Sequence, residues 1–309
     1  MEINVRKKLE KINIRGKIER NISMNLHTTF KTGGIADFFA IPEDYNDIIL
    51  LLEFTREHSI PVFILGGGAN ILVSDKGIRG LIIDMQKISN FSFHNNTCTA
   101  EAGLSISDLA KSAADENLQG LDFIYGMPGT VGGAVWMNAR CYDISISDVL
   151  MSVEYLDKNL DFKTLEFEDI QNNFAYKQSP FQNSSNIILS ATFKLDKGNK
   201  NDIQKNMELH KQDRENKGHY KYPSAGSVFK NNRTFGKPTG IIIESLGLKG
   251  YSKGAAEIAE FHGNIIVNKG EARSEDIRDI IDYTKKLVYE KLGFNLEPEI
   301  QLIGDWEKI

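Results

Sequence analysis

Apolar residues recur along the chain at two spacings, one typical of helices and one typical of strands. The helical spacing is clearest over residues 274–292, where apolar side chains fall every three to four positions and Gly293 follows. This pattern predicts a long amphipathic helix that Ser274 caps and Gly293 ends. Similar spacing predicts helices over residues 3–20, 42–59, 106–117 with Ser105 or Ser107 as its cap, 202–217 and 238–246.

Short apolar runs between these helices have the length of strands. Residues 149–195 contain several such runs separated by turns, and the polar residues 197–201 are typical of a linker. Residues 222–231 begin with small turn-forming residues and become strand-like afterwards. The other runs predict strands after the Gly33-Gly34 turn of residues 25–40, and over 61–65, 71–74, 81–84, 97–102, 264–268 and 296–303.

Two glycine-rich segments interrupt this pattern. Residues 126–139 read GMPGTVGGAVWMNA, and their backbone can approach a partner closely because few side chains stand in the way. Such a loop suits either a bound phosphate or a tight turn before a buried element. The second segment, GGGAN at 66–70, lies between two strand-like runs, whereas a dinucleotide fingerprint needs a strand before it and a helix after it. A Rossmann site is therefore disfavoured.

Composition adds limits on function. The 309 residues are 41% hydrophobic and 26% charged with a net charge of −5, which is typical of a soluble protein of two or three domains. The basic residues are scattered, which argues against a nucleic-acid partner. No apolar run is long enough to span a membrane, and the N-terminus lacks the apolar core of a secretion signal. We therefore expect a cytoplasmic protein.

The numbers and spacing of the cysteines and histidines limit the possible function further. Cys98 and Cys141 are the only cysteines, too few for a disulfide framework or a cysteine zinc site, and we expect two unreactive thiols. The six histidines have no ligand spacing. No metal is predicted.

Several motifs stand in a recognisable order: GGGAN, GMPGTVGGAVWMNA, YPSAGSVFKN at 222–231, and LKGYSKGAAEIAEFHGNIIVNKG at 248–270. Together, from about Thr28 to Gly304, the chain resembles the UDP-N-acetylenolpyruvoylglucosamine reductases. Each motif alone is a weak signal, and their common order is what makes the resemblance specific.

The resemblance implies an α+β fold with two subdomains that bind FAD, of the vanillyl-alcohol-oxidase-like (PCMH) type, followed by a C-terminal α+β substrate domain. The expected division is residues 20–84 with 296–309 returning to them, residues 85–200, and residues 201–295. It also implies a reaction in which NADPH reduces FAD, and the reduced flavin converts UDP-N-acetylglucosamine enolpyruvate to UDP-N-acetylmuramate for peptidoglycan synthesis. The sugar nucleotide is the expected partner of a monomeric enzyme.

The resemblance assigns the flavin pyrophosphate to the two glycine segments, through backbone amides and three side-chain contacts from Asn70, Thr130 and Asn138. For each of these three side chains, a turn-stabilising role is the alternative. The implied cofactor-binding residues are Gly66, Gly67, Gly68, Ala69, Asn70, Gly126, Pro128, Gly129, Thr130, Gly132, Gly133 and Asn138.

Ser227 matches the family's proton donor, the second serine of SAGSVF. Glu299, the second glutamate of LEPEI, matches its C-terminal carboxylate. Glu297 is a neighbouring alternative, because residues two apart on the predicted strand share a face.

Two positions depart from the family pattern. Lys177 follows Tyr176 where the family usually has arginine; it is assigned the arginine's role toward the substrate carboxylate, with less geometric control. Arg140 stands where glycine is common, and would make either a phosphate contact or an outward salt bridge.

Substrate binding is implied for Tyr176 and Asn231, and by position for Arg214 and Lys217, although a charged helix is often merely solvated. The chain lacks the tyrosine-bearing lid loop and so resembles the family's second type. Two alternatives are a flavin-binding paralogue without reductase activity and an oxidase of the wider flavin superfamily, which would not need YPSAGSVFKN.

Overall fold

The structure is a computed structural model that describes residues 3–9 and 11–306. Its residues cluster into two compact units, each assembled from segments that are distant in sequence. The first unit comprises Met1–Glu19, Phe38–Gly67 and Gly80–Gln212, and the second comprises Arg20–Asp37, Gly68–Arg79 and Asp213–Ile309.

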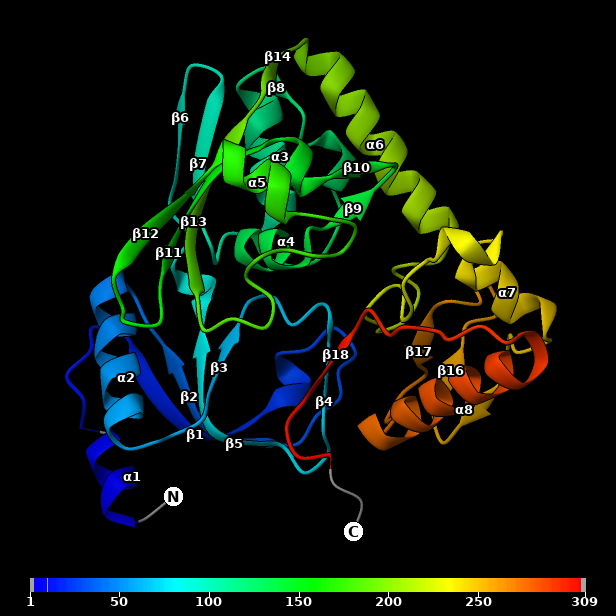
Figure 1. Cartoon of the computed structure of the whole chain (residues 1–309), viewed down its shortest axis with the longest axis horizontal. Coiled ribbons are helices and arrows are strands. Elements are labelled where there is room, and N and C mark those ends of the chain that lie inside the picture. Colours follow the sequence, from blue (N-terminus) through cyan, green and yellow to red (C-terminus); the bar gives the residue numbers. More distant parts are fainter. Residues whose placement is uncertain (1–2, 10, 307–309) are drawn as a thin grey trace. The chain divides into compact units, whose positions relative to one another are not determined.

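The first unit contains a five-stranded sheet of order β12-β11-β13-β7-β6, in which every neighbouring pair is antiparallel (Figure 1). Helix α4 (Val131–Met137) lies beside β13, and α3 (Ile106–Asp115) begins at a Ser105 cap that accepts the Asp108 amide. The strands are β6 (Phe91–His94), β7 (Thr97–Glu101), β11 (Leu150–Leu156), β12 (Phe162–Glu166) and β13 (Ile187–Lys194).

A four-stranded sheet has the order β1-β2-β5-β3. Strands β3 and β5 are parallel, and α2 (Tyr45–Glu57) connects β2 to β3. The Asp44 side chain caps the start of α2 by accepting the Asp47 amide at 2.9 Å. The strands are β1 (Lys17–Ser23), β2 (Ile35–Ile41), β3 (Val62–Leu65) and β5 (Ile78–Asp84).

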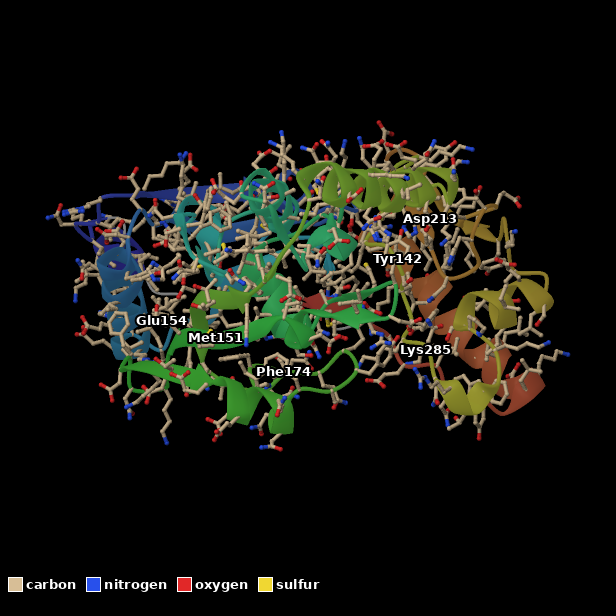
Figure 2. All side chains as sticks on the ribbon, turned by 90° about the horizontal axis from the view of Figure 1, so that it is seen from above. Tyr142, Met151, Glu154, Phe174, Asp213 and Lys285 are labelled. Atoms are coloured by element: carbon tan, nitrogen blue, oxygen red, sulfur yellow. The ribbon has the colours of Figure 1, made fainter. Side chains whose placement is uncertain are left out.

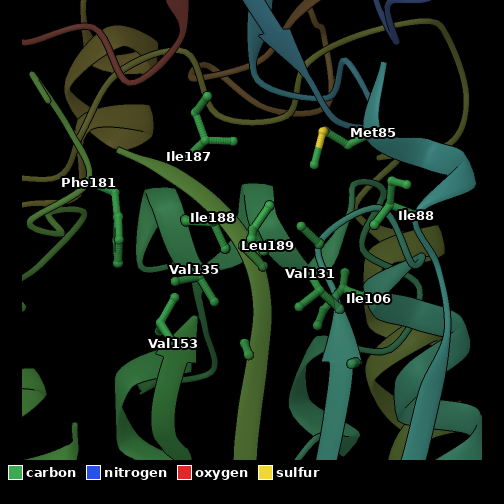
Figure 3. Packing of buried hydrophobic residues seen from close by; sticks show 14 of the residues in the cluster. Met85, Ile88, Ile106, Val131, Val135, Val153, Phe181, Ile187, Ile188 and Leu189 are labelled. Atoms are coloured by element: carbon green, nitrogen blue, oxygen red, sulfur yellow. The ribbon is translucent and has the colours of Figure 1, made fainter. Parts of the chain in front are cut away.

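The core of the first unit joins its sheets and helices. Val131 and Val135 on α4 pack toward Leu189 on β13, and Ile106 of α3 lies beside Val131 (Figure 3). All four side chains are at most 1% exposed. Because α4 is buried in this way, the glycine-rich loop that precedes it is held against the protein body.

The second unit packs two helices against a three-stranded antiparallel sheet of order β15-β16-β17. It also contains the parallel pair β4 and β18, whose register joins Gln301 to Ile71. Its elements are β4 (Ile71–Val73), α7 (Thr239–Ser245), β15 (Ser252–Lys253), β16 (Ala256–Ile258), β17 (Ile266–Asn268), α8 (Ser274–Leu292) and β18 (Gln301–Ile303).

Shorter elements complete the chain. Strand β8 (Leu118–Gln119) pairs with β14 (Asp196–Lys197), and β9 (Arg140–Cys141) pairs with β10 (Ile144–Ser145). The others are α1 (Ile3–Leu9), α5 (Phe167–Asn173) and α6 (Lys200–Asn216), and the 3₁₀ helices η1 (Met24–Leu26), η2 (Met85–Lys87), η3 (Asp122–Ile124), η4 (Ile146–Asp148) and η5 (Arg233–Phe235).

Most predicted elements are confirmed, and α8 has the predicted bounds with Gly293 in the left-handed conformation after it. The Ser274 cap is wrong. The amides of Ser274 and Glu275 donate to the Asp75 carboxylate at 3.0 and 2.9 Å, so a residue about 200 positions earlier caps this helix.

Two predictions near the ends of helices are also wrong. Helix α1 covers only Ile3–Leu9 of the predicted helix. Arg15 and Gly16 are not helical because their amides donate to the buried Asp47 carboxylate, and β1 begins at Lys17. The predicted linker 197–201 is instead structured, with Lys197 in β14 and Lys200 at the start of α6.

The predicted strand 296–303 is confirmed only over β18, and residues 307–309 of its domain segment lie outside the described residues. Residues 222–231 carry isolated bridges at Ser227 and Phe229 in place of a continuous strand. Within residues 3–9 and 11–306, no helix is long and apolar enough to cross a membrane.

Candidate functional site

Two glycine-rich loops of the first unit meet backbone to backbone. A Cβ atom added at Gly66 would lie 2.5 Å from Thr130 Oγ1, and one added at Gly67 would lie 2.8 Å from the Cα atom of Gly129. The backbone of Gly129 leaves no room for a Cβ atom at Gly67, so this position requires glycine, whereas at Gly66 a Cβ atom would meet only the Thr130 side chain. The end of β3 and the start of α4 therefore share one edge made of backbone.

Much of the second loop already donates its amides within the protein. The paired amides are Gly126 N to Ser107 Oγ at 2.9 Å, Gly132 N to Ala102 O at 2.8 Å and Gly133 N to Thr130 Oγ1 at 3.4 Å. An anion contact by the backbone of this loop therefore depends on the amides of Gly129 and Thr130 more than on the loop's ends, since Pro128 has no N–H to donate.

Gly68, Ala69 and Asn70 belong to the second unit. The Gly68 carbonyl accepts the Thr29 amide at 3.1 Å, and the Ala69 carbonyl accepts the Thr29 hydroxyl at 3.5 Å. Asn70 donates from Nδ2 to the Glu299 carbonyl at 3.1 Å, and its own carbonyl accepts the Gln301 amide at 2.9 Å. The Asn70 side chain thus positions the C-terminal carboxylate segment.

Asn138 ends α4 in the left-handed conformation, with φ at 43°. Its side chain is 2% exposed and joins two loops: Nδ2 donates to the Ala175 carbonyl at 2.8 Å, and Oδ1 accepts the Ser147 amide at 3.0 Å. This is the loop-stabilising role that the sequence left open for an asparagine here.

Tyr176 and Lys177 form the tip of a tight turn, residues 175–178, called the Lys177 turn. Ala175 N donates to Gln178 O at 3.2 Å, and Gln178 N donates back to Ala175 O at 3.0 Å. Lys177 has φ at 57°, in the left-handed region that non-glycine residues rarely adopt. The turn follows Phe174, which Figure 2 labels, and lies in the first unit.

Arg140 makes the salt bridge that was one of its two expected uses. Its Nη2 lies 2.8 Å from Asp143 Oδ1, and Nη1 donates to Ser145 Oγ at 3.3 Å, all within the β9–β10 hairpin. At the hairpin tip, Tyr142 (Figure 2) stacks on His210 of α6 with ring centroids 4.1 Å apart. Arg140 therefore stabilises a hairpin that packs on a helix.

Ser227 lies in the second unit on an extended segment, residues 227–230, called the Ser227 strip. Hydrogen bonds run along both of its sides: Val228 N donates to Asn264 O at 2.9 Å, and Glu299 N donates to Val228 O at 2.7 Å. The buried Asn264 side chain accepts Phe229 N at 2.9 Å and donates to Phe229 O at 2.8 Å. Ser227 and Glu299 are thus brought onto adjacent segments.

The structure separates the two glutamates that the sequence could not. Glu299 is 8% exposed, whereas the Glu297 side chain is 68% exposed and pairs with Lys230 Nζ at 2.6 Å. The chain around them is irregular, so strand periodicity does not apply. Glu299 is the buried carboxylate beside the Ser227 strip.

The predicted substrate-binding residues of the second unit have partners within it. Asn231 Oδ1 accepts the Thr239 amide at 2.9 Å, which ties the end of the Ser227 strip to α7. Lys217 pairs with Asp213 at 2.7 Å, and Arg214 Nε donates to the Tyr220 hydroxyl at 3.2 Å. Arg214 and Lys217 are one helical turn apart at the end of α6 and just beyond it.

Next to these basic groups lies a histidine pair that the sequence reasoning did not single out. His219 and His262 have ring centroids 6.2 Å apart. Burial, and then the nearby Arg214 charge, lower the pKa of His219 to about 4. Burial also lowers the pKa of His262, whose Nδ1 accepts the Asn264 amide at 3.1 Å. Both rings are neutral at pH 7.

Neither cysteine is in a reactive setting. Burial raises the pKa of the Cys98 thiol to about 12, and the half-buried Cys141 lies 3.9 Å from the Met127 sulfur. In the part of the chain that the structure describes, no group of three or more histidines, cysteines and carboxylates is arranged to hold a metal.

Two functional candidates escaped the sequence reasoning, Asn264 and Gln182. Asn264 fixes the Ser227 strip, and Gln182 donates from Nε2 to the carbonyls of Lys177 and Trp136. Asn264 stands inside a motif with family resemblance, which was a usable signal. The sequence carries no comparable signal for Gln182, because its hydrogen-bond partners depend on the path of the loop in the folded protein.

Comparison with known proteins agrees with this geometry. Residues 36–161 match the model of an FAD-binding domain, and residues 218–303 match that of the UDP-N-acetylenolpyruvoylglucosamine reductase C-terminal domain. This order confirms the predicted α+β fold class, in which an FAD-binding part is followed by a C-terminal domain of its own.

The chain is 44% identical over 297 residues to a UDP-N-acetylenolpyruvoylglucosamine reductase of Borrelia garinii subsp. bavariensis, covering 96% of this chain and 95% of the relative. It is 43% identical to the Treponema denticola reductase, over 94% and 95% of the two chains. The crystal structure of the Thermus caldophilus reductase matches with a TM-score of 0.78 at 30% identity, covering 93% of this chain and 99% of the other. The chain therefore belongs to the UDP-N-acetylenolpyruvoylglucosamine reductase family of FAD-dependent oxidoreductases.

Proposed function

We propose that this protein reduces UDP-N-acetylglucosamine enolpyruvate to UDP-N-acetylmuramate with electrons from NADPH, in peptidoglycan precursor synthesis. The observation that carries the proposal is the pairing of the Ser227 strip with the Glu299 segment through Glu299 N and Val228 O at 2.7 Å. It places a hydroxyl and a buried carboxylate, the two groups the family's chemistry needs, on neighbouring segments of one unit.

The residues present fit FAD, because the two glycine loops approach so closely that the Gly129 backbone admits no Cβ atom at Gly67. We assign pyrophosphate binding to this edge, with the Gly129 and Thr130 amides as donors and Pro128 shaping the loop before them. The resemblance also assigns Gly68, Ala69 and Asn70 to the cofactor, while Gly126, Gly132, Gly133 and Asn138 shape the loop. Flavin held there would, once NADPH has reduced it, supply the hydride that the terminal carbon of the enol ether accepts.

Ser227 would protonate the adjacent carbon of the substrate. A serine hydroxyl is a weak acid in water, so the step requires a strongly basic carbon beside it and little solvent. The hydrogen bonds of Val228 and Phe229 on both sides of the Ser227 strip fix the backbone that carries the hydroxyl, which lowers the entropy cost of the transfer.

The remaining side chains would bind and orient the substrate. The Lys177 ammonium would attract the substrate carboxylate and stabilise enolate charge, with Tyr176 beside it. Glu299 would accept a hydrogen bond from the enol form. We assign Arg214 and Lys217 to the diphosphate, and Asn231 to the sugar nucleotide.

We further propose the three-part division inferred from the sequence, with residues 20–84 and 296–309 as one FAD-binding subdomain, 85–200 as the other and 201–295 as the substrate domain. A cytoplasmic location is expected, because the substrate is a soluble nucleotide sugar, and the monomeric state is carried over from the family resemblance.

Double-mixing stopped-flow absorbance tests the proposal. Purified protein should carry oxidised flavin, lose the flavin absorbance with NADPH, and regain it when mixed anaerobically with the enolpyruvyl substrate. Protein that takes up no FAD would rule the proposal out. Protein that NADPH reduces, but that only oxygen reoxidises, would be an oxidase or a flavoprotein without this activity.

A further inference from the structure

The Lys177 turn is a strained piece of backbone. A left-handed conformation is sterically unfavourable for a residue with a Cβ atom, and Lys177 adopts it at φ 57°. Such a conformation persists when surrounding contacts over-determine it. The contacts that hold this turn therefore fix the position of the backbone from which the Lys177 side chain extends.

Gln182 bonds directly to the Lys177 backbone. Its Nε2 donates to the Lys177 carbonyl at 3.2 Å and to the Trp136 carbonyl at 2.9 Å, with Met137 Sδ 3.8 Å away. Ser179 also donates to the Trp136 carbonyl, at 2.7 Å. The amide of Gln182 thus joins the end of α4 to the peptide group that follows the strained residue.

Asn138 holds the other side of the same turn. It donates to the Ala175 carbonyl at 2.8 Å and is itself fixed by the Ser147 amide and by burial. Asn138 is the residue that ends α4, and Gln182 binds the Trp136 carbonyl near the end of the same helix. Val135 of this helix is fully buried in the core. The turn is consequently tied through two side-chain amides to one rigid element.

We propose that Gln182 is a positioning residue of the reaction, which acts by fixing the backbone from which Lys177 reaches the substrate carboxylate. Lysine is a point charge on a flexible stem, and lacks the planar fork by which arginine sets its own geometry. A lysine at this position gains geometric control from its backbone. The inference depends on the role proposed above for Lys177.

A double-mutant cycle tests this coupling. Gln182→Met keeps the side-chain length and removes both donated hydrogen bonds. We expect it to slow reoxidation of the reduced enzyme by the enolpyruvyl substrate about tenfold, since small displacements of a positioning group are costly. FAD content and reduction by NADPH should stay within about twofold of the parent protein. In a Lys177→Met background, Gln182→Met should slow reoxidation no further.

Hydrogen exchange gives a readout independent of activity. The Gln178 amide donates to the Ala175 carbonyl across the turn, so its exchange should accelerate in Gln182→Met. Gln178→Met is the matched control: an exposed glutamine of the same turn, replaced in the same way, which should change neither half-reaction. If Gln182→Met does not fold, Gln182→Asn shortens the side chain by one methylene and should give the same loss.

The outcomes separate the two claims. If Lys177→Met does not slow reoxidation, the proposed role of Lys177 is wrong and the inference falls with it. If Lys177→Met slows reoxidation but Gln182→Met slows it equally with and without Lys177, then Gln182 acts elsewhere and only the positioning inference is overturned. A Gln182→Met enzyme with parental rates overturns it as well.

Discussion

The Ser227 strip and the Lys177 turn carry the proposed proton donor and the proposed cation, and they are held in different ways. The strip lies between two segments, one bonded to it through Asn264 and the other through the Glu299 amide. The turn closes on itself and depends on side-chain amides from Asn138 and Gln182 for its attachment.

The Ser227 strip and the Lys177 turn should therefore differ in the substitutions that they tolerate. Main-chain hydrogen bonds do not depend on side-chain identity, so the Ser227 strip should keep its course when its own side chains change. A turn attached through side-chain amides can be released by one substitution. The donor is thus placed by main-chain hydrogen bonds together with one buried side chain, Asn264, whereas the cation is placed by two side-chain amides that bond to its turn.

The largest effect is expected for Ser227→Ala, which removes the hydroxyl and leaves the strip intact. Reoxidation by the enolpyruvyl substrate should slow about 10³-fold, since a positioned proton donor contributes 10²–10⁴-fold. NADPH reduction and the unfolding midpoint should match the parent protein. Equal loss in both half-reactions, measured by stopped-flow absorbance, would mean that the serine supports binding or folding instead.

Asn264→Ala should break the strip itself. It leaves the buried Phe229 amide and carbonyl without their partners, at a cost of about 2–3 kcal/mol in the free energy of unfolding. Urea denaturation followed by tryptophan fluorescence measures this cost. Asn206→Ala, on the exposed face of α6, is the control and should change stability by less than about 0.5 kcal/mol. A similar value for both variants would show that the strip does not depend on Asn264.

A smaller effect, on stability, is expected when the pH is lowered and His219 titrates. His219 has a pKa of about 4 in the folded protein, through burial and then the charges of Arg214 and Lys217, with Asp213 opposing. Since an unfolded histidine titrates near pH 6.5, the unfolded chain binds the extra proton between pH 6.5 and 4. Stability is therefore complete above pH 6.5 and declines toward pH 4.

Replacing His219 should make the free energy of unfolding fall less steeply as the pH is lowered. His219→Gln is expected to recover on the order of 1 kcal/mol of the loss between pH 7 and pH 4.5, after allowance for solvent screening. Urea midpoints at the two pH values measure it. His262 keeps its own lowered pKa and should retain part of the pH dependence. An unchanged slope in His219→Gln would assign the decline to other groups.

Local signals explain which elements could be predicted. The apolar spacing of residues 274–292 and the glycine after them gave α8 its bounds, because a helix face and a left-handed end are properties of the segment itself. The strand-like runs on both sides of GGGAN were read correctly for the same reason. The ordered motifs sufficed for the family.

Long-range partners explain the misses. Asp75 caps α8 across about 200 residues, and Asp47 draws Arg15 and Gly16 out of the predicted N-terminal helix. No local pattern encodes these bonds, because a carboxylate can accept backbone amides from any segment that the fold brings near.

The sequence by itself determined the fold class, the family and the identity of the candidate groups. Tertiary structure alone decided their use: Glu299 is buried while Glu297 faces solvent, Asn138 holds a turn, and Arg140 closes a hairpin. The physical reason is that burial and hydrogen-bond partnership belong to pairs of distant residues, whereas propensity and periodicity belong to neighbours.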